Sequence, residues 1–467
     1  MGLYEHFPYT NFHELNLDWL LLQVKKLRED LNALAGDLDP DAIKQAIYDY
    51  LHDHPDIFPF VTPQMFGAVA DGTADDTEAI QDAIDAGIDV YFPTDHGEVY
   101  KVTQTIDIKA PCKKLYGAGS ARGTANAGVI KREYATVGET GQAAAMFRIG
   151  AGNQGVHINN LRFILGTEGG ANNSGVALDA ETFTFTDKDI YITSCSFVDA
   201  SEAIRFYGRG LSVFDCSFGS CSVAAVINGD TASDTYETRA IRFERTRFHA
   251  MTGDFAVKVM SGHSYGFRMV DCLADRWLHG LIYAAQQANN WLISGNTAQQ
   301  VYRASGADVL IRLEGGADNC AISNNIFRST ETGNGRISHH IYISGPVTGC
   351  RISGNIIDGS HLSPIRISGS GATAGVVIEG NEIQQVADAA NTQYAAIQIN
   401  NASQVGYVIA NNSLAGRQGS VNRLLSGSNV GALKYSTISG NVCGAIPAAA
   451  YDAASCQVTG NVVTLPM

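Results

Sequence analysis

A short motif recurs twelve times between residues 157 and 463, and it limits the possible folds more than any other feature of the sequence. Each copy contains an apolar residue, a special residue three positions later and usually a second apolar residue two positions further on. Successive copies start 20 to 34 residues apart. Helical repeats keep a fixed period because their helices must stack, whereas a β-solenoid can carry extra residues in surface loops. We therefore predict an all-β chain in which residues 116–467 form a right-handed parallel β-helix of about 12 coils.

The special position of the motif changes in character along the chain. Early copies place Cys195, Cys216 and Cys272 there, and seven consecutive later copies place asparagine there: Asn296, Asn325, Asn355, Asn381, Asn412, Asn441 and Asn461. Adjacent coils lie about 4.8 Å apart, so one position per coil forms a column. We expect the asparagine amides to bond to one another along this column and to cap turn backbone groups. The cysteines are expected to be reduced, buried packing residues.

The first 60 residues follow a helical pattern instead. Apolar residues alternate at spacings of three and four from Leu17 to Leu38, as in a coiled coil of about three heptads. Residues 1–60 are therefore predicted to form a helical tether that also promotes oligomerisation. The alternative is an amphipathic helix that packs on its own domain, because Trp19, Leu21 and Leu22 widen the apolar face.

Residues 61–115 are expected to cap the solenoid. The run from Met65 to Pro93 predicts a strand, a loop, a helix and a strand. Thr73 and Asp75 are expected at the N-terminus of this lid helix, where an acid complements the helix dipole. Calcium binding is the less favoured interpretation of these acids, because the spacing lacks the EF-hand pattern. We expect no metal and no cofactor.

Two segments resemble known phage proteins. The run from Met65 to Ala83 resembles the N-terminal signature of the pectate lyase-like β-helix superfamily, in the version found in phage tailspikes and pre-neck appendage proteins. The matching residues are Phe66-Gly67-Ala68, Asp71-Gly72, Asp75-Asp76-Thr77, Ala79-Ile80-Gln81 and Ala83. Residues 8–21 resemble the N-terminal segment of appendage proteins from phages of Gram-positive hosts. The resemblance implies a homotrimer in the virion that recognises, and often cleaves, a host surface polysaccharide or a teichoic acid-like glycan. It also implies that residues 1–40 bind other virion proteins through Phe12, Leu15, Leu17, Trp19 and Leu20.

One set of strand positions predicts a ligand-binding surface. Alternation of inward apolar residues leaves these positions facing outward: Arg205, Val226, Lys258, Tyr283, Arg312, Tyr342, Arg366, Gln398 and Arg423. Five bases and two tyrosines without an acid stand out in a chain of net charge −15. Arginine binds carboxylate or phosphate and tyrosine stacks on sugar rings, so the seven are candidate residues for binding an anionic glycan. The alternative is an ordinary solvated strand face.

Catalytic residues are harder to assign. Glu314, Asp308 and Asp358 are candidates near these positions, and a glycosidase needs two carboxylates roughly 5–9.5 Å apart. An eliminase would need a base and a cation beside the uronate, which Arg312, Tyr342 and Lys258 can supply. Neither mechanism follows from the sequence.

Composition excludes several classes of partner. The net charge of −15 opposes binding to nucleic acid. No apolar run approaches the roughly 18–20 residues of a membrane span, and the first residues lack the basic region of a secretory signal. The missing secretory signal and the resemblance to phage proteins together imply assembly in the host cytoplasm and location in the virion. The alternative function is a free polysaccharide lyase or glycoside hydrolase.

Overall fold

The chain divides into two compact units, Met1–Ile57 and Phe58–Met467. The computed structural model describes Lys25, which is helical and exposed, and residues 59–463 except 94–96, 110–111, 119–127, 135–144, 151–152, 168–173, 181–186, 229–237, 261–263, 276–279, 300–308, 330–336, 361, 387–394, 416–423, 427–432 and 444–455. The predicted coiled coil and the attachment residues Phe12, Leu15, Leu17, Trp19 and Leu20 therefore lie outside the described residues. None of the described helices has the length and apolar character needed to cross a bilayer.

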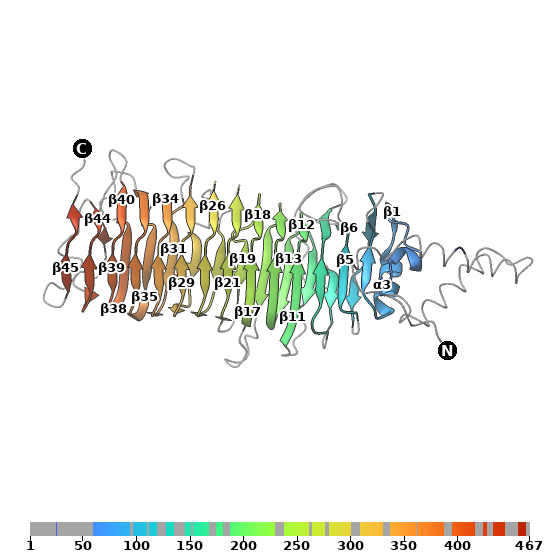
Figure 1. The fold of residues 1–467 in the computed structure, drawn as a ribbon, viewed down its shortest axis with the longest axis horizontal. Helices are drawn as coiled ribbons and strands as arrows, with labels where there is room; N and C mark the ends of the chain where they lie inside the picture. The colour runs from blue at the N-terminus through green and yellow to red at the C-terminus, as the bar shows by residue number, and fades with distance from the viewer. Residues whose placement is uncertain are drawn as a thin grey trace, which may run out of the picture. The chain divides into compact units, whose positions relative to one another are not determined.

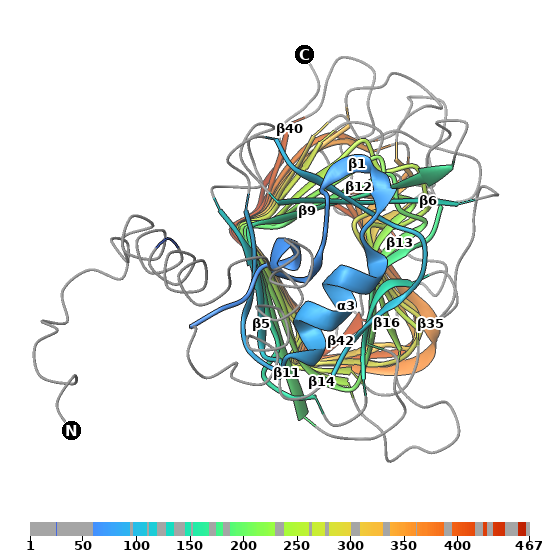
Figure 2. The same cartoon turned by 90° about the vertical axis from the view of Figure 1, so that its right-hand side faces the viewer.

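The second unit is a parallel β-solenoid whose coils have three faces (Figures 1 and 2). Face 1 contains β4 (Ile106–Ile108), β7 (Ala145–Ile149), β10 (Val176–Ala180), β13 (Glu202–Tyr207), β16 (Val223–Asn228), β19 (Val257–Val259), β23 (Ile282–Ala284), β27 (Val309–Leu313), β31 (His339–Ser344), β35 (Ile365–Ala374), β38 (Ile397–Val405) and β41 (Leu425–Ser426). Short strands continue it toward face 2, namely β20 (Ser264–Tyr265), β24 (Ala288–Asn289), β28 (Ala317–Asp318), β32 (Val347–Thr348) and β42 (Leu433–Lys434).

Faces 2 and 3 are formed by the two halves of the repeated motif. Face 2 contains β2 (Val90–Phe92), β5 (Lys114–Gly117), β8 (His157–Asn159), β11 (Asp187–Thr193), β14 (Arg209–Phe214), β17 (Thr238–Glu244), β21 (Arg268–Val270), β25 (Leu292–Ser294), β29 (Ala321–Ser323), β33 (Arg351–Ser353), β36 (Val377–Glu379), β39 (Val408–Ala410), β43 (Thr437–Ser439) and β45 (Gln457–Thr459). Face 3 contains β1 (Asp71–Asp75), β3 (Val99–Val102), β6 (Gly128–Tyr134), β9 (Leu161–Thr167), β12 (Ser196–Val198), β15 (Ser217–Gly219), β18 (Arg247–His249), β22 (Leu273–Asp275), β26 (Thr297–Gln299), β30 (Ile326–Arg328), β34 (Ile356–Ser360), β37 (Glu382–Val386), β40 (Ser413–Ala415), β44 (Val442–Cys443) and β46 (Val462–Val463). The twelve motif copies supply the last twelve of these 15 strands, and the predicted parallel β-helix is confirmed.

A left-handed residue makes the corner between faces 2 and 3 in every motif copy. It directly precedes the special position and has φ between 49° and 71°: Asn160, Ser194, Asp215, Arg245, Asp271, Gly295, Asn324, Gly354, Gly380, Asn411, Gly440 and Gly460. Glycine and asparagine tolerate this conformation best, which explains the Gly-Asn and Asn-Asn pairs of the later copies.

The asparagines of the special position form a continuous hydrogen-bonded ladder inside this corner. Asn355 Oδ1 accepts from the backbone N–H of Asn325 at 3.1 Å and from its Nδ2 at 2.9 Å. Asn355 Nδ2 donates to Oδ1 of Asn381 and to the carbonyl of Ile322, both at 2.9 Å. The amide-to-amide contact repeats from Asn296 to Asn461. All nine cysteines are free thiols, and eight of them are buried.

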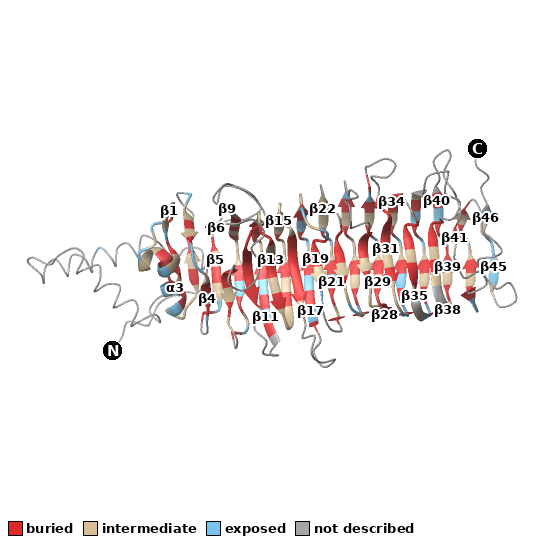
Figure 3. Cartoon of the chain, turned by 180° about the vertical axis from the view of Figure 1, so that it is seen from behind, coloured by how far each residue is buried: buried red, intermediate tan, exposed pale blue. Residues whose placement is uncertain are grey.

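Alternation along each strand builds the interior, as the buried bands in Figure 3 show. On face 3, Phe163, Phe197, Phe218 and Phe248 stack in successive coils with ring centroids 4.9 to 5.5 Å apart. Burial of each such side chain contributes about 1.5–3 kcal/mol.

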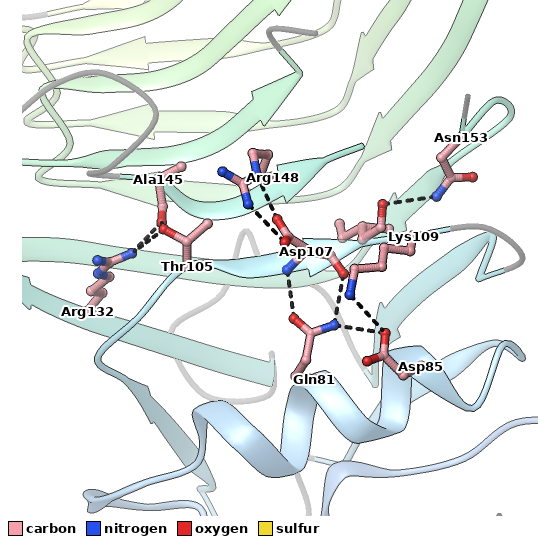
Figure 4. Close-up of polar contacts among 10 residues, drawn as sticks. Gln81, Asp85, Thr105, Asp107, Lys109, Arg132, Ala145, Arg148 and Asn153 are labelled. Carbon is pink, nitrogen blue, oxygen red and sulfur yellow. Dashed lines mark hydrogen bonds and ion pairs between the residues drawn. The ribbon is translucent and has the colours of Figure 1, made fainter. Parts of the chain in front are cut away.

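The helix α3 (Thr77–Asp85) covers the N-terminal end of the solenoid after the short 3₁₀ helix η2 (Pro63–Phe66) (Figure 2). The helix begins two residues later than Asp75, because residues 71–75 form β1. Asp75 still accepts from the N–H of Thr77 at 3.1 Å, whereas Thr73 bonds to Asp71. Figure 4 shows how α3 contacts the first coils through Gln81 and Asp85.

Candidate functional site

The outward positions of face 1 form one continuous column over eight coils. Strand pairing aligns Arg205, Val226, Lys258, Tyr283, Arg312, Tyr342, Arg366 and Gln398, which we call the outward column. Their strand neighbours point inward; Ile341 and Ile343, for example, are fully buried on either side of half-buried Tyr342. The register therefore gathers basic and aromatic side chains on one face of the solenoid.

The predicted end of this column at Arg423 is wrong. Ser426 pairs with Gln398, and Arg423 lies outside the described residues. The cause is a pair of consecutive buried leucines, Leu424 and Leu425, which breaks the alternation at the start of β41. Toward the N-terminus the register continues through Asp179, Arg148 and Asp107, so acids do occupy this face before Arg205.

Arginines lie over tyrosines in the C-terminal half of the outward column. The guanidinium carbon of Arg312 is 5.8 Å from the ring centroid of Tyr283, and that of Arg366 is 5.3 Å from the centroid of Tyr342. Both distances fall in the range of cation–π attraction. The side chains are half-buried, so each ring and guanidinium is partly ordered by its neighbours but still reaches the surface.

Acids beside the column neutralise three of its four bases, which the sequence did not predict. Arg205 pairs with Glu202 at 3.0 Å, Lys258 with Asp254 at 2.5 Å, and Arg312 with Glu314. Glu202 and Asp254 precede the aligned residues in sequence. Only Glu314, two residues after Arg312, could have been found from strand alternation.

Glu314 also accepts a hydrogen bond of 2.6 Å from the hydroxyl of Tyr283. Burial and this contact with Glu314 raise the pKa of Tyr283 to about 12, so the hydroxyl stays protonated and keeps donating. Tyr283, Arg312 and Glu314 thus form one connected polar cluster, with Phe255 packed against the tyrosine ring at 5.3 Å.

Arg366 has a different environment. Within the described part of the chain no carboxylate forms an ion pair with it, and its Nη1 lies 3.3 Å from Nε2 of His339. His339 Nδ1 lies 2.5 Å from the carbonyl of Ser363, which can only accept, so Nδ1 carries the proton and Nε2 accepts from Arg366. Arg366 is therefore the column base whose charge is least compensated.

Of the three candidate catalytic residues, the structure describes Glu314 and Asp358, which lie on different faces. Glu314 lies beside the outward column, Asp358 lies in β34 on face 3, and Asp308 is outside the described residues. The two described candidates, Glu314 and Asp358, therefore do not form a pair of carboxylates on one face.

No family model and no curated protein matches the sequence. Among solved structures, the Dettilon tailspike protein is similar to this chain with a TM-score of 0.51 at 13% identity, over 81% of this chain and 71% of that one. PfbA, a surface adhesin of Streptococcus pneumoniae, gives a TM-score of 0.47 at 16% identity over 81% and 91%. DFA-IIIase from Arthrobacter chlorophenolicus A6 gives 0.45 at 12% over 86% and 98%. At 13% identity, the similarity to the Dettilon tailspike protein shows the β-solenoid fold and no more.

Proposed function

We propose that this chain is a bacteriophage virion protein, of the tailspike or appendage type, that binds an anionic host-surface glycan along face 1. The observation that carries the proposal is the alternation of Tyr283, Arg312, Tyr342 and Arg366 over four consecutive coils. Aromatic rings supply faces for sugars and guanidinium groups supply paired donors for carboxylate or phosphate. Coils about 4.8 Å apart present these groups along a line, as an extended glycan requires.

Binding, rather than cleavage, is the activity that this geometry supports. Glu314 is held by Arg312 and Tyr283, and Asp358, the other candidate carboxylate in the described part of the chain, lies on face 3. The sequence resemblance supports the remaining parts of the proposal, in which residues 1–40 attach the chain to other virion proteins and three chains assemble.

Charge reversal at two column positions tests the proposed surface. Arg312→Glu combined with Arg366→Glu should weaken binding to immobilised polygalacturonate and to poly(glycerol phosphate) teichoic acid by about tenfold or more at low salt, since each loses a charge-assisted contact. The loss should shrink as salt rises, because ions screen exposed charges. New reducing ends or unsaturated products, measured in the same samples, report any cleavage.

The matched control is Arg268→Glu combined with Arg328→Glu. These exposed arginines lie on faces 2 and 3, and the double substitution changes the net charge by the same amount. If both double variants lose the same affinity for the glycans, only the overall charge of the protein matters. If the Arg312→Glu, Arg366→Glu variant binds like wild type, the outward column has no role in binding.

The proposed assembly has its own test. Sedimentation equilibrium of the intact protein should give three times the chain mass of 49.8 kDa. A single chain mass at micromolar protein would contradict the trimer but not the glycan surface.

A further inference from the structure

Face 3 carries a hollow that is separate from the outward column. It has a volume of about 480 Å³, and its lining residues come from β12, β15, β18 and β22 and the corners beside them. Its floor is made by small outward residues, Ser196, Ser217 and Gly219, at positions where neighbouring coils carry long side chains. In the strand pairing, Ser217 lies beside Arg247 and Gly219 lies beside His249. Arg247 and His249, two long polar residues of the next coil, therefore form one wall of the hollow.

That wall is a built polar network. His249 Nδ1 lies 2.6 Å from Oδ1 of Asp275, and Arg247 Nη2 lies 2.6 Å from Oδ2 of the same carboxylate. Burial opposes ionisation of Asp275, but the hydrogen bonds from Arg247 and His249 hold its pKa below the ordinary value. An ionised carboxylate only accepts, so Nδ1 of His249 donates to it and Nε2 remains for a ligand. Arg247 uses only Nη2 on Asp275, which leaves its other donors available.

The two arginines that line the hollow are each more exposed than the acid with which they pair. The side chains of Arg245 and Arg247 are 54% and 50% exposed, whereas their acidic partners Asp215 and Asp275 are 30% and 19% exposed. Asp271 also contributes to the rim. The floor adds the hydroxyls of Ser196 and Ser217, 3.1 Å apart, beside the apolar side chains of Val198 and Leu273. Hydroxyls, a guanidinium and small apolar patches together match a sugar that carries an anionic group.

We propose that this hollow is a second carbohydrate site, which binds one anionic sugar unit with its carboxylate or phosphate at Arg247 and a hydroxyl at Nε2 of His249. The site lies on a different face from the outward column and does not depend on it. A glycan that reaches both faces would then be held at two points, which raises its effective affinity without new contacts at either site.

Two variants test the site in different ways. Arg247→Ala removes the proposed anion contact, and Gly219→Leu fills the hollow, because a Cβ built on Gly219 meets no atom within 4 Å. Neither change touches the core, and Gly219→Leu replaces glycine in a strand, so folding should survive. Melting curves check that both variants remain folded. The matched control is Arg328→Ala on the same face, in β30.

Calorimetric titration of the full chain with glucuronic acid, glucose 6-phosphate and glucose gives the readout. We expect binding of at least one anionic sugar, no comparable binding of glucose, a loss of about tenfold in Arg247→Ala and a loss of binding in Gly219→Leu. The two anionic probes distinguish a carboxylate site from a phosphate site. Equal binding of glucose, no binding of either anionic sugar, or unchanged binding in both variants would overturn the proposal. The Arg312→Glu, Arg366→Glu variant should bind these sugars like wild type, so failure of the outward column would leave this result unaffected.

Discussion

The side-chain amide of Gln81 both accepts a hydrogen bond from the backbone of Asp107 and donates one to it. The N–H of Asp107 donates to Gln81 Oε1 at 2.8 Å, and Gln81 Nε2 donates to the carbonyl of Asp107 at 3.0 Å. Asp107 belongs to β4. Among the described residues, β4 pairs with one strand, β7. The glutamine amide therefore replaces a missing neighbouring strand at this edge, which would otherwise be open to pairing with another chain.

The first prediction follows from this contact. Gln81→Leu keeps the side-chain size but leaves both backbone groups of Asp107 without a partner, so it should lower the free energy of unfolding by about 1–3 kcal/mol. Hydrogen–deuterium exchange of the β4 backbone should become faster. Glu78→Gln, at an exposed position in the first turn of the same helix, is the control: loss of its charge at the helix N-terminus should cost no more than about 1 kcal/mol and should leave exchange in β4 unchanged. Unchanged exchange in β4 of Gln81→Leu would contradict the capping role.

The asparagine ladder gives the second prediction. Asn355→Leu removes the acceptor of Asn325 and the donor to Ile322 and Asn381, in a fully buried position. The unmade bonds should cost at least about 1–3 kcal/mol, measured by urea unfolding. Asn461→Leu should cost less, because Asn461 is half-buried at the last coil of the ladder. Equal stability of Asn355→Leu and wild type would mean that the ladder contributes nothing.

The sequence was sufficient for the repeating part of the structure because its period and its strand alternation are both local. The motif predicted the ladder position, and strand alternation predicted the register of the outward column as far as Gln398. Alternation failed at β41, since Leu424 packs inward at the corner immediately before the inward Leu425. A residue at a corner does not follow the inward–outward alternation of a strand, so packing against the adjacent coil sets the direction of its side chain.

The contacts around the column could not be predicted in the same way. Asp254 lies before β19 and reaches Lys258 from outside the strand. The hollow on face 3 depends on Gly219 and His249, which are 30 residues apart and become neighbours only through the register of β15 and β18. Variable loop lengths hide such pairs, because each coil boundary must be known before residues of adjacent coils can be aligned.

Two glycines provide a third prediction about how closely adjacent coils pack. Gly316 and Gly380 have φ of +98° and +61°, so alanine at either position carries a backbone penalty of about 1–2 kcal/mol. A Cβ at Gly316 would lie 2.3 Å from the carbonyl oxygen of Pro346, whereas at Gly380 its nearest neighbour is 3.9 Å away. Gly316→Ala should therefore be less stable than Gly380→Ala by about 1–3 kcal/mol in thermal unfolding. Similar losses would show that the coils at Gly316 can separate at little cost.

The last prediction concerns His340, a fully buried residue of β31. Its Nδ1 lies 2.6 Å from the hydroxyl of Ser360, and its ring stacks on Phe327 at 6.1 Å. Burial, with a smaller contribution from His339, lowers the pKa of His340 to about 3 from 6.5. The unfolded chain therefore takes up a proton as pH falls below about 6.5, while the folded chain does not until about pH 3.

Stability should consequently fall across this window, with a slope from His340 of up to about 1.4 kcal/mol per pH unit. His340→Phe removes the titrating group, and its loss of the Ser360 contact is the same at every pH. The drop in melting temperature between pH 7 and pH 4.5 should therefore be smaller in His340→Phe than in wild type. His157→Phe is the control for the loss of one histidine, because His157 is exposed on face 2 and its replacement leaves the buried His340 in place. If wild type and His340→Phe lose the same melting temperature over this range, His340 is not the buried group that makes the solenoid sensitive to acid.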